Sequence, residues 1–559
     1  MALQRGERSA IDIADAIATR VKAYLHSCVR IDTRTLAVFR IGAALIMIAE
    51  VLLRARNFSF FYNESGVVPQ AMATDRTVDY AVSFYFFTTD SALIVLLMGL
   101  HILVALVLLV GYRTRTMTVL AFFFVISLDF HNPLVNSYAD TLFRMLLFWA
   151  MFLPLGERWS VDSLRGVTDR RPYFVGVASV LALGQMVYMY VRNGIHKTQS
   201  EQWTGDAWIG DMLTGDLALS EFSLGAEATP LILGRDDITF FLGEYSHHVT
   251  PILELGTTLW FYMMLTAWLL ILLRGRWRYP VILLFIGGHA TFAVTVRIGL
   301  FPYVAMLGLL LFLPREFWED GNRLLRRLGV RAGAVPERVA HGARAMRRLP
   351  NGCLLPWDIR TVAYQFALLF VVVTMVVYAA FSGAALVGLD DHTNEGMENQ
   401  LNHMASTINV DQPDWSIFAP NPGTRDRYYV FPARTESGDI VDVYNEREDV
   451  YDEEFNWERP YDRLNEQYGT YRERFYMNSV RRDNTSREHS VATEYANYLC
   501  ENWETEDGEG LTHISMWQVI ETVTLDSIEN HEDREQSTLA MHRFGCDDRD
   551  PKVLVRTTG

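Results

Sequence analysis

The sequence predicts a mainly α-helical integral membrane protein, in which a multi-span helical bundle of about nine spans precedes an α+β domain. Apolar runs recur as far as about residue 389, and arginine-rich segments separate several of them. From Asp390 onward the chain is polar, with 37 Asp and Glu against 16 Lys and Arg. This tail has a net charge of −21, the residues before it carry +5, and the whole chain carries −16. The chain therefore divides into a membrane bundle, residues 34–390, and an acidic domain, residues 391–559.

The distribution of arginine predicts the topology. The nine predicted spans cover residues 36–53, 92–110, 117–129, 142–155, 173–191, 251–273, 281–296, 300–313 and 362–386. If the N-terminus is cytoplasmic, the arginine-rich segments 113–115, 157–171, 274–278 and 315–348 all fall inside, as the positive-inside rule requires. The segments 56–90, 131–140 and 194–250 then lie outside with the tail. We therefore expect a multi-pass protein of the cell membrane with an extracellular C-terminal domain.

The two ends of the chain are soluble. Residues 1–33 form a cytoplasmic segment, in which residues 10–27 fit an amphipathic helix on the membrane bilayer and an ordinary soluble helix equally well. In the tail, Ser437-Gly438-Asp439 is a typical turn between two strand-like stretches. The predicted tail elements are a hairpin over 427–434 and 440–444, helices over 460–482 and 487–503, and a strand over 514–525.

The amino-acid composition limits which partners and cofactors are expected. The acidity and the near-absence of lysine are typical of proteins from high-salt habitats, and a basic partner is the other interpretation. No basic patch indicates binding to nucleic acid. The four cysteines form no C-x-x-C pair, so no metal is expected. Cys500 and Cys546 could pair if the tail faces an oxidising space.

Polar residues inside apolar spans are the informative ones, because hydrocarbon penalises them by several kcal/mol. Most of them fall toward the outer side on the predicted topology, which fits a cavity that opens outward with Lys197 at its rim. The alternative is a set of mutually satisfied buried pairs, for example Asp140 with Arg144 one helical turn on. These polar residues are Arg40, Glu50, His101, Asp129, Asp140, Arg144, Gln185, Glu254, His289 and Arg297.

Lys197 is the strongest catalytic candidate. It follows the apolar run 173–191 and is one of only three lysines, with Lys22 and Lys552, in a chain that uses 47 arginines. A desolvated lysine can lose its proton near neutral pH and act as a base, whereas arginine cannot. The alternative is a lysine that extends toward the membrane interface for its charge alone.

Five stretches resemble the membrane-domain family of the vitamin K-dependent gamma-carboxylase, whose prokaryotic relatives are called horizontally transferred transmembrane domain (HTTM) proteins. The likeness covers about residues 34–425, and the composition points to a member of halophilic type. The stretches are Arg40-Ile41-Gly42 through Phe61-Tyr62 to Gly66-Val67-Val68-Pro69, Asn136-Ser137-Tyr138, Gly194-Ile195-His196-Lys197 with Trp203, His289 with Gly299-Leu300-Phe301-Pro302-Tyr303-Val304, and Asp411-Gln412 with Trp415 and Phe418-Ala419-Pro420-Asn421-Pro422.

This resemblance implies quinol chemistry. In the carboxylase, a base lysine deprotonates a reduced naphthoquinone, such as a vitamin K or menaquinol-type lipid quinol. O2 then converts it to an epoxide, and the basic intermediate deprotonates a glutamyl side chain, to which CO2 adds. Lys197 matches the base, and His289 matches a histidine of the quinol-pocket segment. The candidates for quinol binding are Asn136, Tyr138, His196, Glu254 and Tyr303.

Two positions depart from the family pattern. Asn136 stands where the carboxylase has a functional histidine, and His196 replaces a second lysine. The tail has no obvious likeness to the region that binds the carboxylase's protein substrate. The expected activity is therefore oxygenation of a lipid quinol, with carboxylation of an extracellular protein or peptide as an extension. The alternative function is a non-catalytic membrane scaffold or lipid-binding protein that presents the acidic domain.

Overall fold

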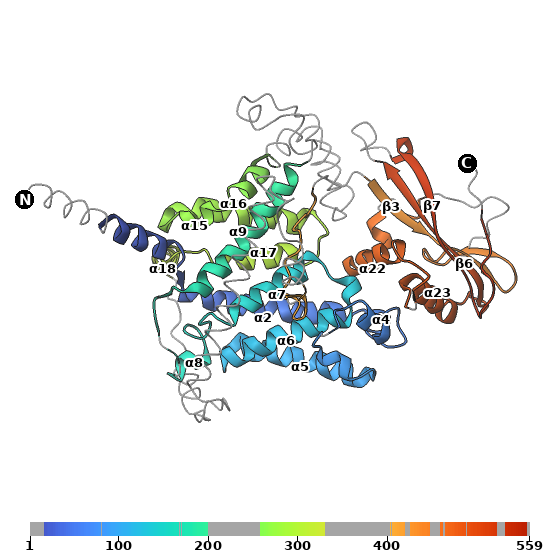
Figure 1. Ribbon diagram of the computed structural model, residues 1–559, viewed down its shortest axis with the longest axis horizontal. Coiled ribbons are helices and arrows are strands. Elements are labelled where there is room, and N and C mark those ends of the chain that lie inside the picture. Colours follow the sequence, from blue (N-terminus) through green and yellow to red (C-terminus); the bar gives the residue numbers. More distant parts are fainter. Residues whose placement is uncertain are drawn as a thin grey trace, which may run out of the picture.

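A computed structural model gives the fold of most of the chain. The described residues are 16–79, 81–166, 168, 170–199, 256, 258–329, 403, 405–419, 425–447, 459–461, 464–487, 489–522 and 531–555. A helical bundle forms one part of the molecule, and a domain with a β-sheet and two helices forms the other (Figure 1). The prediction of a mainly helical body followed by an α+β domain is confirmed at this level.

The helices of the bundle fall on the apolar runs. They are α2 (Thr33–Ala55), α5 (Ser91–Val110), α6 (Thr114–His131), α7 (Tyr138–Ala150), α9 (Val177–Lys197), α15 (Leu269–Leu272), α16 (Tyr279–Thr295) and α17 (Phe301–Leu310), with shorter α3 (Phe58–Phe61), α4 (Gln70–Asp75) and α8 (Val161–Leu164) between them. In the described part of the chain, α2 and α5 are the two helices long and apolar enough to cross a membrane. The ninth predicted span, 362–386, lies outside the described residues.

Local chemistry sets several helix boundaries. Asp90 accepts a hydrogen bond from the backbone N–H of Leu93 at the start of α5, and Gly111 ends that helix with a φ of 71°. At the start of α7, Ser137 and Asp140 form a capping box, in which each side chain satisfies the other's backbone. The loop 131–138 is therefore fixed at the point where α6 turns into α7.

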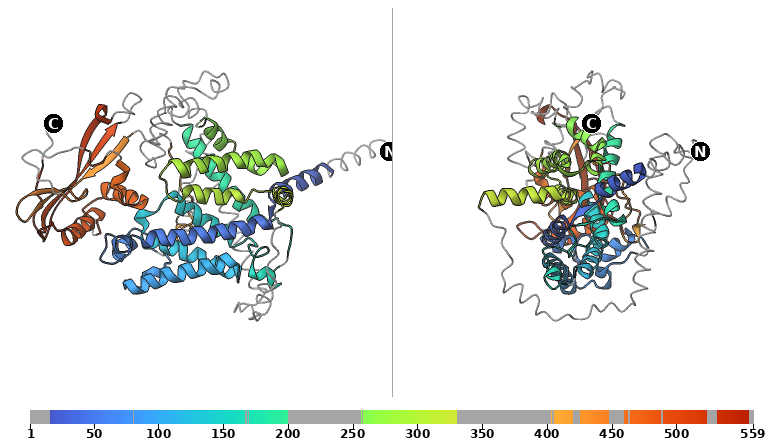
Figure 2. Two further views of the ribbon diagram at one scale, coloured as in Figure 1. Left: turned by 180° about the vertical axis from the view of Figure 1, so that it is seen from behind. Right: turned by 90° about the vertical axis from the view of Figure 1, so that its left-hand side faces the viewer.

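One end of the bundle is rich in arginine, and the sheet domain lies at the other end. At one end Arg40 donates to the carbonyl oxygens of Leu155, Arg158 and Trp159, which lie in an arginine-rich loop. The helix at residues 16–28 and α18 (Arg315–Arg327) leave from this same end, whereas the sheet domain lies at the opposite end (Figures 1 and 2). A two-stranded pair, β1 (Ile31–Asp32) with β2 (Tyr173–Phe174), also belongs to the arginine-rich end.

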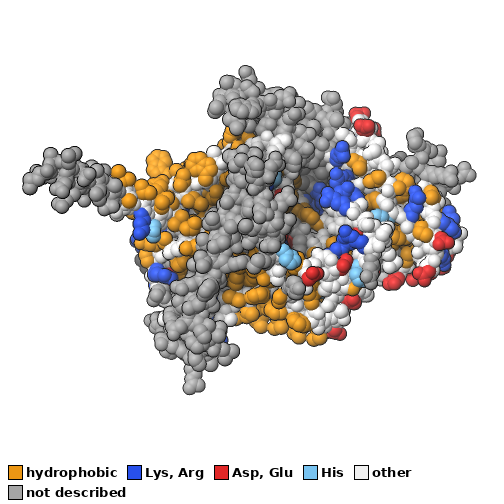
Figure 3. Space-filling model, in the orientation of Figure 1, with side chains coloured by type: hydrophobic (Ala, Val, Ile, Leu, Met, Phe, Trp, Pro, Cys, Tyr) orange, Lys and Arg blue, Asp and Glu red, His pale blue; other side chains and the backbone are white. Residues whose placement is uncertain are grey.

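The bundle has an apolar outer surface. Along α5 seven large aliphatic side chains are exposed: Leu93, Val95, Leu96, Leu100, Leu103, Leu106 and Val110. Figure 3 shows hydrophobic side chains gathered over the bundle, while charged side chains gather over the sheet domain. An exposed apolar surface of this extent is typical of contact with a membrane or another apolar partner.

The tail contains an antiparallel sheet. Strand β6 (Leu511–Thr522) is central: β3 (Arg425–Val430) and then β4 (Pro432–Thr435) pair along one edge, and β7 (Glu535–Gly545) pairs along the other. Strand β5 (Ile440–Asp442) pairs with β4, with Arg434 opposite Ile440, and Gly438 in the turn has a φ of 104°. The predicted turn and the pairing across it are confirmed, but the first predicted strand, 427–434, is divided into β3 and β4, and only β4 pairs with β5.

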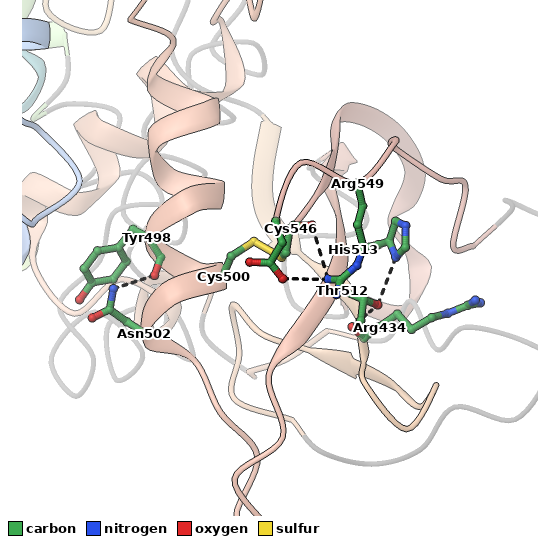
Figure 4. The surroundings of a disulfide bond; sticks show 9 residues. Arg434, Tyr498, Cys500, Asn502, Thr512, His513, Cys546 and Arg549 are labelled. Atoms are coloured by element: carbon green, nitrogen blue, oxygen red, sulfur yellow. Dashed lines mark hydrogen bonds and ion pairs between the residues drawn. A yellow bond between two sulfur atoms is a disulfide. The ribbon is translucent and has the colours of Figure 1, made fainter.

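Two helices, α22 (Tyr471–Arg481) and α23 (Val491–Asn502), pack beside this sheet. Cys500 at the end of α23 forms a disulfide with Cys546, which follows β7 (Figure 4). The pairing that the sequence left open is therefore present, and it closes a loop across 46 residues. A disulfide here is consistent with a tail in an oxidising compartment.

We expect the disulfide to hold α23 against the sheet. Replacing both Cys500 and Cys546 by Ser should lower the stability of the tail by about 4 kcal/mol, from the loop-closure entropy of a loop of this size. The measurement is hydrogen exchange of β6 and β7 in the full chain, with and without reductant. Reductant should accelerate exchange in the wild type and leave the double variant unchanged. Exchange in the wild type that ignores reductant would contradict this role.

Candidate functional site

A buried cluster of charges joins the bundle to the tail. Arg54 of α2 donates to Glu50 at 2.8 Å, to Asp129 at 2.6 Å and to Asp140 at 2.8 Å. Arg472 of α22 reaches from the tail to the same acids, and bonds Asp140 at 2.9 Å and Glu50. All four bundle residues are buried. Five side chains from α2, α6, α7 and α22 thus meet at one point.

The charges of the cluster balance only when the tail is included. Arg144 of α7 completes it through Asp129, at 3.4 Å. The cluster then contains three carboxylates and three guanidinium groups, and one of the guanidinium groups is that of Arg472. The predicted pairing of Asp140 with Arg144 is wrong, because Asp140 is used by Arg54, Arg472 and the cap of its own helix. A buried ion whose partner is removed typically costs several kcal/mol.

A small cavity lies beside this cluster. Its walls come from α2, α5, α6, α7 and α17, and Glu50, Arg54, Asp129 and Asp140 form its charged side. Its volume of about 10 Å³ is room for about one water. His101 of α5 also lines it, and neither ring nitrogen has a hydrogen-bond partner among the described residues. Lys197 is not among the residues that line this cavity, so it is not the outward cavity expected beside Lys197.

Lys197 lies at the end of α9 and is 2% exposed. Its amine donates to the backbone carbonyl oxygens of Ile417 and Phe418, at 2.9 and 2.8 Å. The residue is past the apolar run 173–191, and burial in the protein lowers the pKa of its amine to about 7. A large fraction of the Lys197 amine is therefore neutral near physiological pH. The segment 405–419, which leads into the tail, covers this amine.

The same segment is held by further contacts with the bundle. Asn193, one turn before Lys197, donates to the carbonyl oxygens of Trp415 and Ile417 at 2.6 and 3.0 Å. Gln185 and Gln412 exchange two amide hydrogen bonds, at 3.1 and 2.7 Å. Trp415 is fully buried, and its backbone is in the left-handed region with a φ of 52°. Such a conformation persists only where surrounding contacts hold it, and it is common at functional sites.

His289 of α16 has a separate environment. Its Nε2 lies 2.6 Å from the hydroxyl oxygen of Tyr190, on α9. The rings of Trp260, Phe292 and Phe301 surround it, and the side chain is buried. Tyr190 and Lys197 are seven residues apart on α9, which is about 10 Å along the helix. His289 therefore contacts α9, the helix that carries Lys197, about two turns before Lys197.

The residues predicted to bind the quinol do not lie together in the structure. Tyr138 stacks on Trp415, with ring centroids 5.8 Å apart, and its hydroxyl lies 3.2 Å from the Ser416 hydroxyl. Asn136 instead belongs to the charge cluster, where it accepts from Arg54 at 3.4 Å and donates to the Asp129 carbonyl. The other three are not assembled: His196 is half-buried beside Lys197, Tyr303 is 42% exposed, and Glu254 lies outside the described residues.

Several residues of the site were not predicted. Arg54 could have been found, because it follows Glu50 by four positions and so faces it on one helix. Asn193 could also have been found, one turn before Lys197. Nothing in the sequence distinguishes Arg472 from the other arginines of the tail.

Comparison with known proteins identifies no relative: no family model matches the chain, and neither a curated protein nor a solved structure does. The function is therefore argued from the geometry and from the resemblance of the sequence stretches described above.

We expect Arg472→Ala to loosen the tail from the bundle. The change leaves three buried carboxylates with two arginines, and the cost of such an unbalanced charge is about 3 kcal/mol. Hydrogen exchange of α22 and limited proteolysis of the full chain should both become faster.

Arg474→Ala, on the same helix, is the matched control and should have little effect. Adding Glu50→Gln to Arg472→Ala removes the excess negative charge and should recover part of the loss. Equal effects of the Arg472 and Arg474 changes would contradict the role of the cluster.

Proposed function

We propose that the protein is a membrane enzyme that oxygenates a lipid quinol, with Lys197 as the general base. The observation that carries the proposal is the buried amine of Lys197, whose pKa is lowered to about 7. A base that is half-deprotonated near the operating pH is the efficient choice for removing a proton from a weak acid. The membrane placement is supported by the two apolar helices and by the arginine-rich end of the bundle, which would face the cytoplasm.

In this proposal the bundle has about nine spans and the disulfide-bonded tail is extracellular. The neutral amine of Lys197 accepts the proton of a quinol hydroxyl and becomes an ammonium, which the carbonyl oxygens of Ile417 and Phe418 are placed to stabilise. Tyr138 and Trp415 present aromatic faces of the kind that hold a naphthoquinol ring. A reduced naphthoquinone would supply the electrons that O2 accepts. Carboxylation with CO2 of an extracellular glutamyl substrate is the extension that the family resemblance implies.

Access to the amine requires movement of the segment 415–418. The segment accepts two N–H hydrogen bonds from Lys197 and covers the side chain, which is only 2% exposed, so a quinol hydroxyl reaches the lone pair of the amine only when the segment moves. The Lys197 amine and the rings of Tyr138 and Trp415 are the kinds of group that bind a quinol. In this conformation the segment 415–418 fills the space between the amine and these rings. Substrate binding in this proposal therefore includes displacement of that segment, a gating step of the type common in enzymes.

We expect Lys197→Arg to abolish quinol-dependent O2 consumption, by at least about 100-fold, the usual contribution of a general base. Arginine keeps the positive charge and can donate to carbonyl oxygens, but it cannot act as a base. Lys22→Arg, in the N-terminal helix, is the matched control and should retain full activity. An unchanged rate in the Lys197 variant, with the protein folded and inserted, would refute the assignment.

The pH dependence tests the same group independently. Because burial lowers the pKa of Lys197 to about 7, the neutral amine predominates above that pH. The rate of quinol oxidation should therefore rise as the pH passes from 6 to 8 and then level off. An amine with its ordinary pKa of 10.5 would instead give a rate that still rises above pH 9. The measurement is kcat/KM against pH with a reduced short-chain naphthoquinone.

One observation favours the scaffold alternative. Both Lys197 and Asn193 bond the segment that leads into the tail, so Lys197 could serve only to hold the domain in place. Asn193→Ala separates the two functions, since it removes contacts to the same segment without removing a base. An enzyme should lose far more activity from Lys197→Ala than from Asn193→Ala, whereas a scaffold should respond to both changes equally, by exposing residues 405–419 to protease.

A further inference from the structure

A second cavity lies at the arginine-rich end of the bundle, on the far side from the tail. It has a volume of about 40 Å³, room for roughly three waters or for a phosphate group with its ester arm outside. Arg278 is buried at its base, and Arg274 and Arg315 are exposed at its rim. Arg30 completes its set of cations, and Asp32 is the one carboxylate of its lining.

The charge of this cavity is not balanced by the described residues around it. Asp32 pairs with Arg34 at 2.7 Å, and Arg315 pairs with Glu319 at 2.6 Å. Glu316 is 4.0 Å from Arg30. The lining and its ion-pair partners together contain five arginines and three carboxylates. The arginines are Arg30, Arg34, Arg274, Arg278 and Arg315, and the carboxylates are Asp32, Glu316 and Glu319.

Of the four arginines that line this cavity, Arg274 and Arg278 form no ion pair with a described residue. Arg278 donates to the carbonyl oxygens of Cys28, Ile271, Leu273 and Phe312 and meets no carboxylate in these contacts. Arg274 lies over the ring of Tyr24, 4.2 Å from its centroid, and donates to the hydroxyl of Ser27. A buried guanidinium of this kind attracts an anion, and arginine binds phosphate oxygens well.

The surroundings of the cavity are suited to the surface of a bilayer. The helix at 16–28 exposes four apolar side chains on one face, Ile17, Val21, Tyr24 and Leu25. Helix α18 combines exposed Phe317, Leu324, Leu325 and Leu328 with Arg323, Arg326 and Arg327. Trp277, in the short 3-10 helix Gly275–Arg278 beside the cavity, is 82% exposed. Amphipathic helices and an exposed tryptophan are typical of the membrane–water interface, where lipid phosphates lie.

We propose that this cavity binds the phosphate of an anionic phospholipid in the cytoplasmic leaflet. Basic pockets between membrane helices on the cytoplasmic side hold acidic head groups in this way. The acyl chains would lie along the apolar surface of the adjoining helices, while Arg30, Arg274 and Arg278 contact the phosphate oxygens. The inference uses the membrane placement proposed above but is independent of the chemistry at Lys197.

The test is lipid retention by the full chain. The wild type and the double variant Arg30→Gln with Arg274→Gln are purified in phosphate-free buffer and titrated with phosphatidylglycerol or phosphatidylcholine, with native mass spectrometry as the readout. The double variant should bind phosphatidylglycerol about 25-fold more weakly, from roughly 5-fold per arginine. Its binding of phosphatidylcholine should change little. Arg326→Gln with Arg327→Gln removes the same charge outside the cavity and is the matched control; its loss should be clearly smaller, because exposed charges that do not contact the phosphate are screened by salt.

A third variant, Ser27→Glu, places a carboxylate in the cavity without removing an arginine. It should release phosphatidylglycerol to a similar extent, which keeps the test valid if the double arginine variant does not fold. Equal losses in the cavity and control variants would overturn the proposal, because the attraction would then be general surface charge. Displacement of phosphatidylglycerol by millimolar inorganic phosphate alone would overturn the assignment to lipid and identify a site for a free anion. Quinol oxidation should be unchanged in all three variants, and its loss would overturn the independence of this cavity from Lys197, which lies at the opposite end of the bundle.

Discussion

The fold depends on neutralising three buried carboxylates at the place where α2, α6 and α7 of the bundle meet the tail. Glu50, Asp129 and Asp140 are buried together, and in apolar surroundings each must be paired with a cation. Arg54 and Arg144 come from the bundle itself, but the third cation, Arg472, comes from a helix more than 400 residues along the chain from Glu50. The ends of α2, α6 and α7 are therefore electrostatically complete only when the tail is docked. The tail is part of the fold rather than an appended module.

A second connection between the two parts is made by backbone groups rather than by charges. The segment 405–419 presents carbonyl oxygens to Asn193 and Lys197, and its Trp415 fills a buried position between α7 and α9. This contact also creates the environment of Lys197, since the segment helps to exclude water from the amine. Docking of the tail and the acidity of Lys197 are consequently coupled. Any change that lifts the segment exposes the amine and returns its pKa toward the ordinary value of a lysine in water.

The sequence predicts those parts of the fold that local patterns determine. Apolar runs located the helices α2, α5 and α6 to within a few residues, and the turn at Gly438 located the β4–β5 hairpin. Pairings across long separations were not predictable in the same way. Arg472 looks like Arg474 in the sequence, and only the docked position of α22 distinguishes them. The two carbonyl oxygens that accept hydrogen bonds from Lys197 belong to the backbone, which every residue has, so no residue type indicates them. The local pairing rule failed for Asp140 because three other groups compete for that carboxylate.

Lys197 can be compared with other buried cations of the chain that donate to backbone carbonyl oxygens. Arg40 and Arg278 are also buried, and both donate their hydrogen bonds mainly to backbone carbonyl oxygens. Where the fold needs a buried cation to satisfy carbonyl groups, this chain thus uses arginine, in keeping with its 47 arginines and three lysines. Lys197 also donates to backbone carbonyl oxygens, those of Ile417 and Phe418, but it is the residue type that can release its proton. Arginine could give the same structural support to the segment 405–419, so the choice of lysine favours the proposal of proton transfer. This difference between otherwise similar sites is the physical reason for preferring the enzymatic proposal to the scaffold.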